Sequence, residues 1–161
     1  MKTYTKILFA IMLMLTTVTA SAQVKAFEKY SDTEGVTYVY ISKALLRMAG
    51  AFNLPSAPGT NMKKIIPKVD AIQIITSEED GMASRLKRDT ESIVKAQNYE
   101  LLMQVDDDGD KVRIYHQEGK KQSAIIMLTS SDDEVIVIVF TGKFTLQDVQ
   151  SIVKEAKVEK K

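Results

Sequence analysis

The sequence predicts an α+β fold: a two-layer sandwich with a largely antiparallel sheet, a C-terminal four-stranded meander and helices mainly on one face. Three observations predict it. Four short segments rich in β-branched residues follow one another between Tyr99 and Gly142, joined by compact turns. Two more such segments precede them, and amphipathic segments with helical spacing lie before, between and after. Strands joined in series form an antiparallel meander, and helices must cover its apolar face.

Before the meander, the spacing of apolar residues predicts the helices and strands, and glycine and proline residues predict where they end. Glycine and proline mark the ends, because glycine terminates helices and proline disfavours helical geometry in the residue before it. Residues 51–60 hold two of the three prolines and predict an irregular loop. The expected elements are a helix carrying Val24, Phe27 and Tyr30, a strand over 36–42, a helix over 42–50, a short helix ending near Pro67, a strand over 69–76 and an amphipathic helix over 78–98.

The meander strands are expected over 99–106, 110–117, 121–130 and 134–142, and a helix over 145–156 follows them. Thr145 and Asp148 approximate a capping box at the start of that last helix. The connections between the two earlier strands and the meander are long enough for helical crossovers, so they allow a mixed sheet.

The first 22 residues have the pattern of a secretory signal peptide. Two lysines precede an unbroken apolar run of nine residues, 7–15, and small residues at 20–22 supply a signal-peptidase site before Gln23. The run is too short for a membrane span, which takes about 20 residues. We therefore expect a signal peptide over 1–22 and a single α+β domain over 23–161, exported to the periplasm or outside the cell.

The composition argues against several classes of function. The chain has no cysteine, which excludes a lipoprotein anchor, disulfides, thiolate catalysis and cysteine-ligated metals. Without residues 1–22 the 22 Lys and Arg fall to 20, against 21 Asp and Glu, a net charge of −1. No basic patch indicates nucleic acid or an anionic membrane. We expect a soluble protein without a nucleic-acid partner and without an integral membrane segment after signal cleavage.

The most specific functional signal is the alternation of residues in the last two strands. A strand with one wet face alternates apolar and polar residues, but 121–130 and 134–142 are apolar on both faces. Either both faces are covered within the monomer, or half of these side chains form a surface for a partner or a second copy. The candidates for an interaction surface, which include tyrosines that could stack on a ligand and an arginine as polar handle, are Tyr38, Tyr40, Arg113, Tyr115, Ile126, Leu128, Ile136 and Ile138.

The aspartates around Gly109 predict a hairpin turn. An EF-hand loop with Gly109 at position six would need a carboxylate where Tyr115 stands, and the flanks have strand patterns. Asp108-Gly109 instead supplies the positive-φ residues of a tight turn. In a meander the first and third turns emerge at the same end of the sheet, so an acidic rim that binds calcium weakly stays a candidate. Its carboxylates would be Asp106, Asp108, Asp110, Asp132 and Asp133.

Catalytic motifs are missing from the sequence. His116 is the only histidine, and neither a Gly-x-Ser-x-Gly elbow, an HExxH pair nor a glycine-rich phosphate loop accompanies it. A hydrolase base would need a nucleophile and an orienting carboxylate. We expect a partly exposed, structural histidine at the end of its strand, no catalytic residues, no cofactor and no enzymatic activity.

Five segments carry a resemblance to a known family. In order they are a signal peptide ending in SAQ, then FEKYSDTEGVTYVYISKALLRM, VDAIQIITSE, YELLMQVDDDGDKVRIYHQEG and VIVIVFTGKFTLQDV. The chain resembles a family of small exported proteins of the Bacteroidota, catalogued as domain of unknown function 4252. The resemblance covers nearly all of the mature chain, rests on a diffuse pattern and implies an α+β fold and an envelope location. It implies no activity and no functional residues.

From these observations we expect a non-enzymatic envelope protein that binds another protein, or itself, through its sheet. The alternative, from another class, is a module that binds a small ligand or calcium weakly. A concave pocket where Tyr38, Tyr40, Arg113 and Tyr115 converge would favour the alternative.

Overall fold

The computed structural model describes residues 22–51, 66–148 and 150. The predicted signal peptide, nearly all of the loop over 51–60 and most of the short helix before Pro67 lie outside these residues. The helical elements are α2 (Ala22–Glu28), α3 (Lys43–Ala51), the 3-10 turn η1 (Ile66–Lys68) and α5 (Asp80–Ala96). The strands are β1 (Thr37–Ser42), β2 (Val69–Ser77), β3 (Glu100–Asp107), β4 (Asp110–Gln117), β5 (Ser123–Ser130) and β6 (Val135–Gly142).

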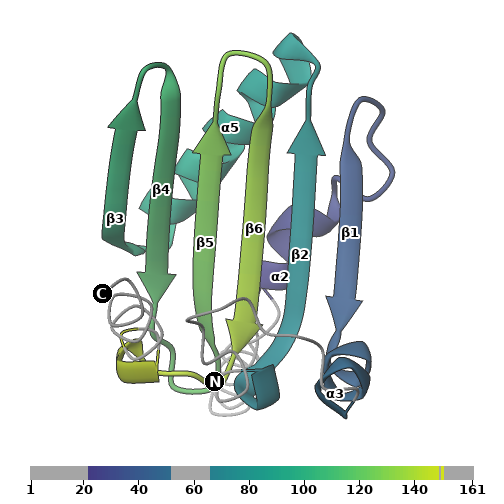
Figure 1. Cartoon of the computed structure of the whole chain (residues 1–161), viewed down its shortest axis with the longest axis vertical. Coiled ribbons are helices and arrows are strands. Elements are labelled where there is room, and N and C mark those ends of the chain that lie inside the picture. The colour runs from purple at the N-terminus through teal and green to yellow at the C-terminus, as the bar shows by residue number, and fades with distance from the viewer. Residues whose placement is uncertain (1–21, 52–65, 149, 151–161) are drawn as a thin grey trace, which may run out of the picture.

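The six strands form one sheet in the order β1-β2-β6-β5-β4-β3, and every neighbouring pair is antiparallel. The predicted α+β sandwich with its four-stranded meander is confirmed, with α2 and α5 on one face of the sheet (Figure 1). The alternative of a mixed sheet, which the connection lengths allowed, is wrong. Helix α5 carries the chain across the sheet from β2 to the far edge at β3, and the meander then returns strand by strand until β6 pairs with β2.

Local chemistry sets the ends of these elements. Asp108 and Gly109 have φ values of 41° and 100°, so the β3–β4 hairpin closes through the tight turn that the sequence predicts. After β6 a helix begins at Leu146. The Thr145 amide donates to Asp148 Oδ2 at 2.8 Å and the Asp148 amide donates to Thr145 Oγ1 at 3.3 Å, which confirms the capping box. Apart from residue 150, which is also helical, the rest of the helix predicted over 145–156 lies outside the described residues.

The main core lies between the helices and one face of the sheet. Apolar side chains from the α2 segment, α5 and the central strands pack together there, as their spacing predicts. The fully buried members with the largest side chains include Phe27, Tyr30, Ile75, Leu86, Ile126, Val137 and Val139.

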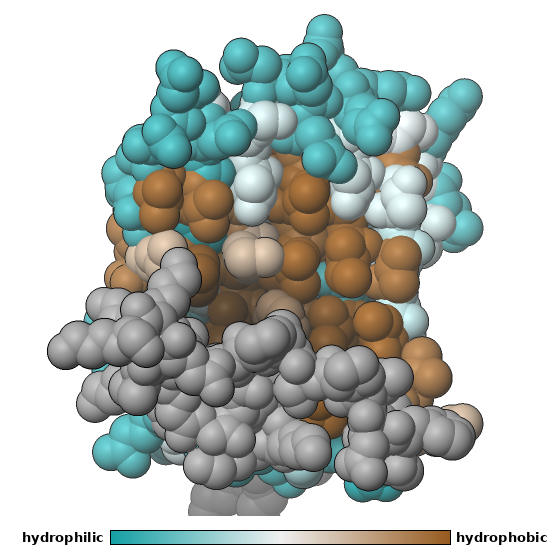
Figure 2. Space-filling view, viewed as in Figure 1, coloured by the Kyte–Doolittle hydropathy of each residue, from teal (hydrophilic) through white to brown (hydrophobic). Residues whose placement is uncertain are grey.

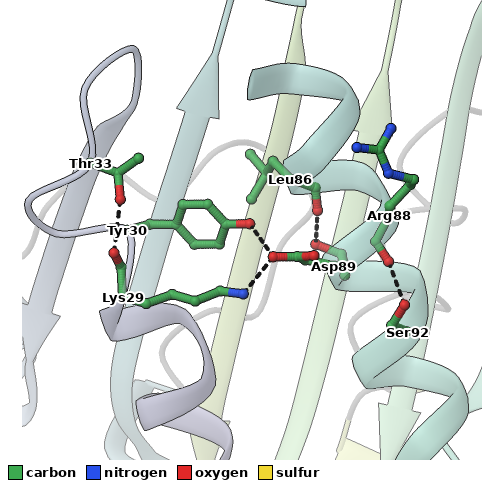
Figure 3. A network of polar contacts seen from close by, with 8 residues as sticks. Lys29, Tyr30, Thr33, Leu86, Arg88, Asp89 and Ser92 are labelled. Carbon is green, nitrogen blue, oxygen red and sulfur yellow. Dashed lines mark hydrogen bonds and ion pairs between the residues drawn. The ribbon is translucent and has the colours of Figure 1, made fainter. Parts of the chain in front are cut away.

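A network of hydrogen bonds and an ion pair connects the residues directly after α2 to helix α5 (Figure 3). The Asp89 carboxylate accepts hydrogen bonds from the Tyr30 hydroxyl, at 2.7 Å, and from the Lys29 ammonium group. Burial by itself would raise the pKa of Asp89, but these two donors, with the positive charges of Lys29 and Arg85, outweigh it and hold that pKa below its usual range. Burial and the bond to Asp89 raise the pKa of Tyr30. The carboxylate is therefore bound in its charged form.

Candidate functional site

The two faces of the sheet are both apolar but differ in what covers them. Ile126 and Leu128 are 0% and 2% exposed, in the core on the helix side. They are therefore not part of an accessible surface, which corrects their place among the interaction candidates. Ile136 and Ile138 point to the opposite face, because side chains alternate along a strand and their neighbours in β6, Val135 and Val137, lie in the core.

On that opposite face the strand register aligns side chains into rows that cross all six strands. We call two of these rows the open face. The middle row is Val39, Ile74, Ile138, Met127, Ile114 and Met103. The outer row is Thr37, Thr76, Ile136, Thr129, Val112 and Val105. Neither row contains a charged residue, and the middle row is apolar from edge to edge.

The third row of this face is closed. Ile41, Ile72, Phe140 and Ile125 pack there against a second, smaller cluster formed by Leu46 of α3, Val69 and Phe144. Helix α3, η1 and the segment after β6 thus cover the sheet at the end where β1 finishes. The open face begins where this cover stops.

Figure 2 shows the open face as a band of hydrophobic side chains below the hydrophilic turns at the top of the view. At the two edges, Val39 and Met103 are 41% and 47% exposed. Side chains of the middle row in the central strands are half-buried, because neighbouring strands on both sides shield them. Six strands about 4.8 Å apart and four residues of about 3.4 Å give the open face roughly 29 Å by 14 Å, or about 400 Å². Apolar patches of this size on monomers are often functional.

Most of the open face was not identified from the sequence. Val39, Ile74, Ile114, Met103 and Met127 belong to the middle row but were not among the candidates. Their alternation within each strand matches that of Ile136 and Ile138 in β6. The missing information was the strand order and the register, which decide the residues that share a row.

The tyrosine and arginine candidates lie on the helix side of the sheet and do not converge. Tyr38 and Tyr40 belong to β1, while Arg113 and Tyr115 belong to β4, with β2, β6 and β5 in between. Four strand spacings of about 4.8 Å separate the two groups by roughly 19 Å. The four residues therefore do not form the shared pocket that would favour a small-ligand site.

Each of these polar side chains has a local role, apart from Tyr40, which is 51% exposed at the sheet edge. The Tyr38 hydroxyl accepts a hydrogen bond from the Gln73 side chain at 2.7 Å. Arg113 donates to the Val105 carbonyl oxygen at 3.0 Å and pairs with Asp106 at 2.7 Å. Tyr115 packs beside the core, where burial raises its pKa.

The two acidic turns meet at one end of the sheet, as the meander predicts. The Asp132 carboxylate lies 3.7 Å from where a side chain on Gly109 would begin. The Arg113 guanidinium and the Gln104 amide bind Asp106 and hold its pKa below the usual range. Asp108, Asp110 and Asp133 are exposed. In the part of the chain that the structure describes, no three acidic, histidine or cysteine side chains are placed to hold a metal ion.

His116 lies at the closed end of the sheet and is 3% exposed, so the prediction of a partly exposed residue is wrong. Its ring faces Phe144 with 6.5 Å between the centroids, and its Nε2 atom has no hydrogen-bond partner among the described residues. Phe144 follows the last strand, so this burial depends on a segment far from β4 in sequence. His116 packs as part of the sheet.

Comparisons with known proteins identify a family. The model of the family described as Domain of unknown function (DUF4252) matches residues 30–152, which confirms the family named in the resemblance. No functionally curated protein matches the sequence. None of the described helices has the length and apolar character that crossing a bilayer requires.

Two solved structures show weak overall similarity. One is a protein of unknown function, PA94, from Pseudomonas aeruginosa, with 13% identity over 80% of this chain and 82% of that one and a TM-score of 0.35. The other is cyanobacterial PsbP (CyanoP) from Synechocystis sp. PCC 6803, with 11% identity over 78% of each chain and a TM-score of 0.34. TM-scores of this size do not establish a shared fold.

Proposed function

We propose that this protein, which belongs to the family described as Domain of unknown function (DUF4252), is a non-enzymatic binding protein whose open face docks onto another protein. The observation that carries the proposal is the uncharged middle row, which runs across the sheet with no described helix packed on it. Full burial of one large exposed apolar side chain contributes about 1.5–3 kcal/mol, and the half-buried members of the row contribute the part that is still exposed. A partner that covers several of them gains enough free energy to bind.

The surroundings of the open face favour a protein as the partner. A protein interface has an apolar centre and a polar rim. The open face supplies the centre, and the turns beside its outer row supply exposed polar groups, among them Glu78, Asp132 and Asp133. Nucleic acid would need cations where these acids stand. The complementary surface is therefore apolar in the middle and polar or basic toward the turns.

An envelope location and the absence of catalysis belong to the same proposal. The lysines, apolar run and small residues of 1–22 favour export, with Gln23 as the first residue of the mature chain. Sequencing the N-terminus of protein from producing cells tests this, and a retained Met1 would contradict it. The burial of His116 against Phe144 favours a binding role, because a general base must reach a substrate.

Photo-crosslinking tests the docking surface. A photoreactive residue is introduced in native cells at Ile138, on the open face, or at Ser92, which is exposed on α5. We expect position 138 to capture a specific protein, and we expect that position 92 does not capture the same protein. The captured protein is then purified and its affinity measured by calorimetry.

Two substitutions complete the test. Ile138→Lys places a charge in the middle row, so we expect it to weaken binding at least about tenfold. Ser92→Lys adds the same charge on the helix side and should leave the affinity unchanged. Equal affinity of Ile138→Lys and the unsubstituted protein would overturn the proposed function.

A further inference from the structure

The sheet ends in two edge strands, β1 and β3, and they differ in how they are protected. An edge strand presents unpaired backbone N–H and C=O groups, to which another strand can add. Figure 1 shows the two strands at opposite edges of the sheet. Among the described residues, the backbone hydrogen bonds made outside helices and paired strands do not involve residues 37–42, and β1 pairs only with β2.

Edge strand β3 carries several features that discourage pairing with another strand. It has a bulge between Leu101 and Met103 and carries acids at both ends, Glu100, Asp106 and Asp107. The Arg113 side chain also folds over it, onto the Val105 carbonyl oxygen and Asp106. Bulges and charges are the devices by which edge strands resist association.

Edge strand β1 has none of these features. Its sequence, TYVYIS, contains no charge, proline or glycine, and all six residues pair with β2 without a shift of register. Thr37, Val39 and Tyr40 are exposed. A regular, uncharged edge with exposed apolar side chains is a template for another strand.

We propose that β1 pairs antiparallel with β1 of a second copy of this chain, across a two-fold axis perpendicular to the sheet and centred on Val39. Opposed residues in an antiparallel pair share a face, which limits the registers to those that pair residues of equal parity. Centring on Val39 joins the middle rows of the two open faces. On the helix side it sets Tyr38 against Tyr40 of the second copy, an aromatic pair that stabilises adjacent strands.

Charges beside β1 are complementary in this arrangement. Exposed acids, Asp32 and Glu34, precede the strand, while exposed Arg47 follows it. Lys43, which also follows it, is already paired with Asp70 of its own chain. Antiparallel pairing of two copies brings the acids of each chain beside Arg47 of the other. The same pairing through β3 would bring Glu100 beside Asp106 and Asp107, and like charges across strands destabilise a pair. The charge pattern therefore favours a second copy at β1 and opposes one at β3.

This pairing goes beyond the proposed function and does not require the open face to be occupied. It does join two open faces into one continuous surface, doubling about 400 Å² to about 800 Å². That is the area that each partner contributes to a stable protein interface of standard size. The edge contact thus provides the larger platform that one copy lacks.

Sedimentation equilibrium of the purified protein, from about 1 to 100 μM, tests the pairing. We expect a dimer. Val39→Lys sets two lysines against each other at the axis and should raise the dissociation constant at least about 100-fold. Met103→Lys is the matched control, because Met103 ends the same row at the other edge and has a similar exposed fraction. It should leave the dimer intact.

Each other outcome overturns the edge pairing. If the unsubstituted protein is monomeric over the whole concentration range, the edge pairing is wrong. If only Met103→Lys loses the dimer, the two copies associate through β3 instead. Loss in both variants indicates contact between open faces, which would contradict the edge pairing while leaving the proposed function standing. A dimer that survives both substitutions uses another surface.

A single cysteine tests the register, because the chain has no native thiol to interfere. Opposed Cα atoms in an antiparallel pair lie about 4.5–5.5 Å apart, within disulfide range. Val39→Cys should therefore oxidise to a covalent dimer, and Met103→Cys should not. Equal oxidation of the two variants would contradict pairing centred on Val39.

Discussion

Two neighbouring isoleucines in β2 point to opposite faces of the sheet, so substituting each of them compares how much burial on each face contributes to stability. Ile75 is 0% exposed in the main core, while Ile74 lies in the middle row of the open face. The substitutions Ile75→Ala and Ile74→Ala remove the same atoms from adjacent positions of one strand. Because both substitutions replace isoleucine by alanine in the same strand, the change in intrinsic strand propensity is the same in the two variants. A difference between their free energies of unfolding therefore reports the surroundings of each side chain.

The two costs follow from burial. Ile75→Ala loses the transfer free energy of the side chain and leaves a cavity under α5, so we expect about 4 kcal/mol. Ile74→Ala leaves no closed cavity, because water fills the space. Full burial of three methylene-sized groups is worth about 2.4 kcal/mol at about 0.8 kcal/mol each, and Ile74 is only partly buried. We therefore expect about 1 kcal/mol at position 74.

Urea unfolding measures both costs, at a protein concentration low enough to keep the chain monomeric. The dependence of the free energy on urea should be equal in the two variants, so that shifts in midpoint report stability alone. A loss at Ile74→Ala within about 1 kcal/mol of the loss at Ile75→Ala would refute the reasoning, because it would mean that the open face is a closed core in solution.

Three further predictions concern the polar network and the turns. The pKa of Asp89 is lowered in the folded protein, so the stability from its charge is present above the unfolded pKa and lost as pH falls through the folded value. The stability gap between the unsubstituted protein and Asp89→Asn should shrink from pH 7 to pH 2 in urea titrations, and a constant gap would contradict the network. Gly109 has a φ of 100° and Gly81, on α5, has open space around it. Thermal melting should show Gly109→Ala destabilised by about 1 kcal/mol or more and Gly81→Ala unchanged or stabilised. Because the described carboxylates form no metal-binding group, millimolar calcium should leave the midpoint of melting unchanged, and a rise would restore the calcium site.

Much of the local structure could be predicted from the sequence because it depends on local chemistry. The Asp108-Gly109 turn, the capping box at Thr145 and the six strands all follow from residues close together in the chain. The pairing of β2 with β6 could not be predicted in this way. It depends on where α5 crosses the sheet, and the connection length alone also allowed a parallel strand.

The candidate site could be predicted only in part, for the same reason. Alternation places Ile126 and Ile138 on definite faces of their own strands, but it cannot say which face the helices cover when both are apolar. That choice is made by the helix face of α5, through Leu86 and Val94. The rows that join Val39 to Met103 then require a register across the whole sheet.

The central claim is that the open face is occupied by a partner in the cell. Thiol labelling of Ile138→Cys and Ser92→Cys tests it most directly, because the chain has no other cysteine. Each rate with a membrane-permeant maleimide is measured in intact cells and on purified protein. A bound partner should slow labelling at position 138 in cells by at least about tenfold, the protection expected when about nine-tenths of the molecules are covered, while position 92 stays unchanged. If the ratio of the labelling rate in cells to the rate on purified protein were equal at positions 138 and 92, the claim that a partner covers the open face would be contradicted.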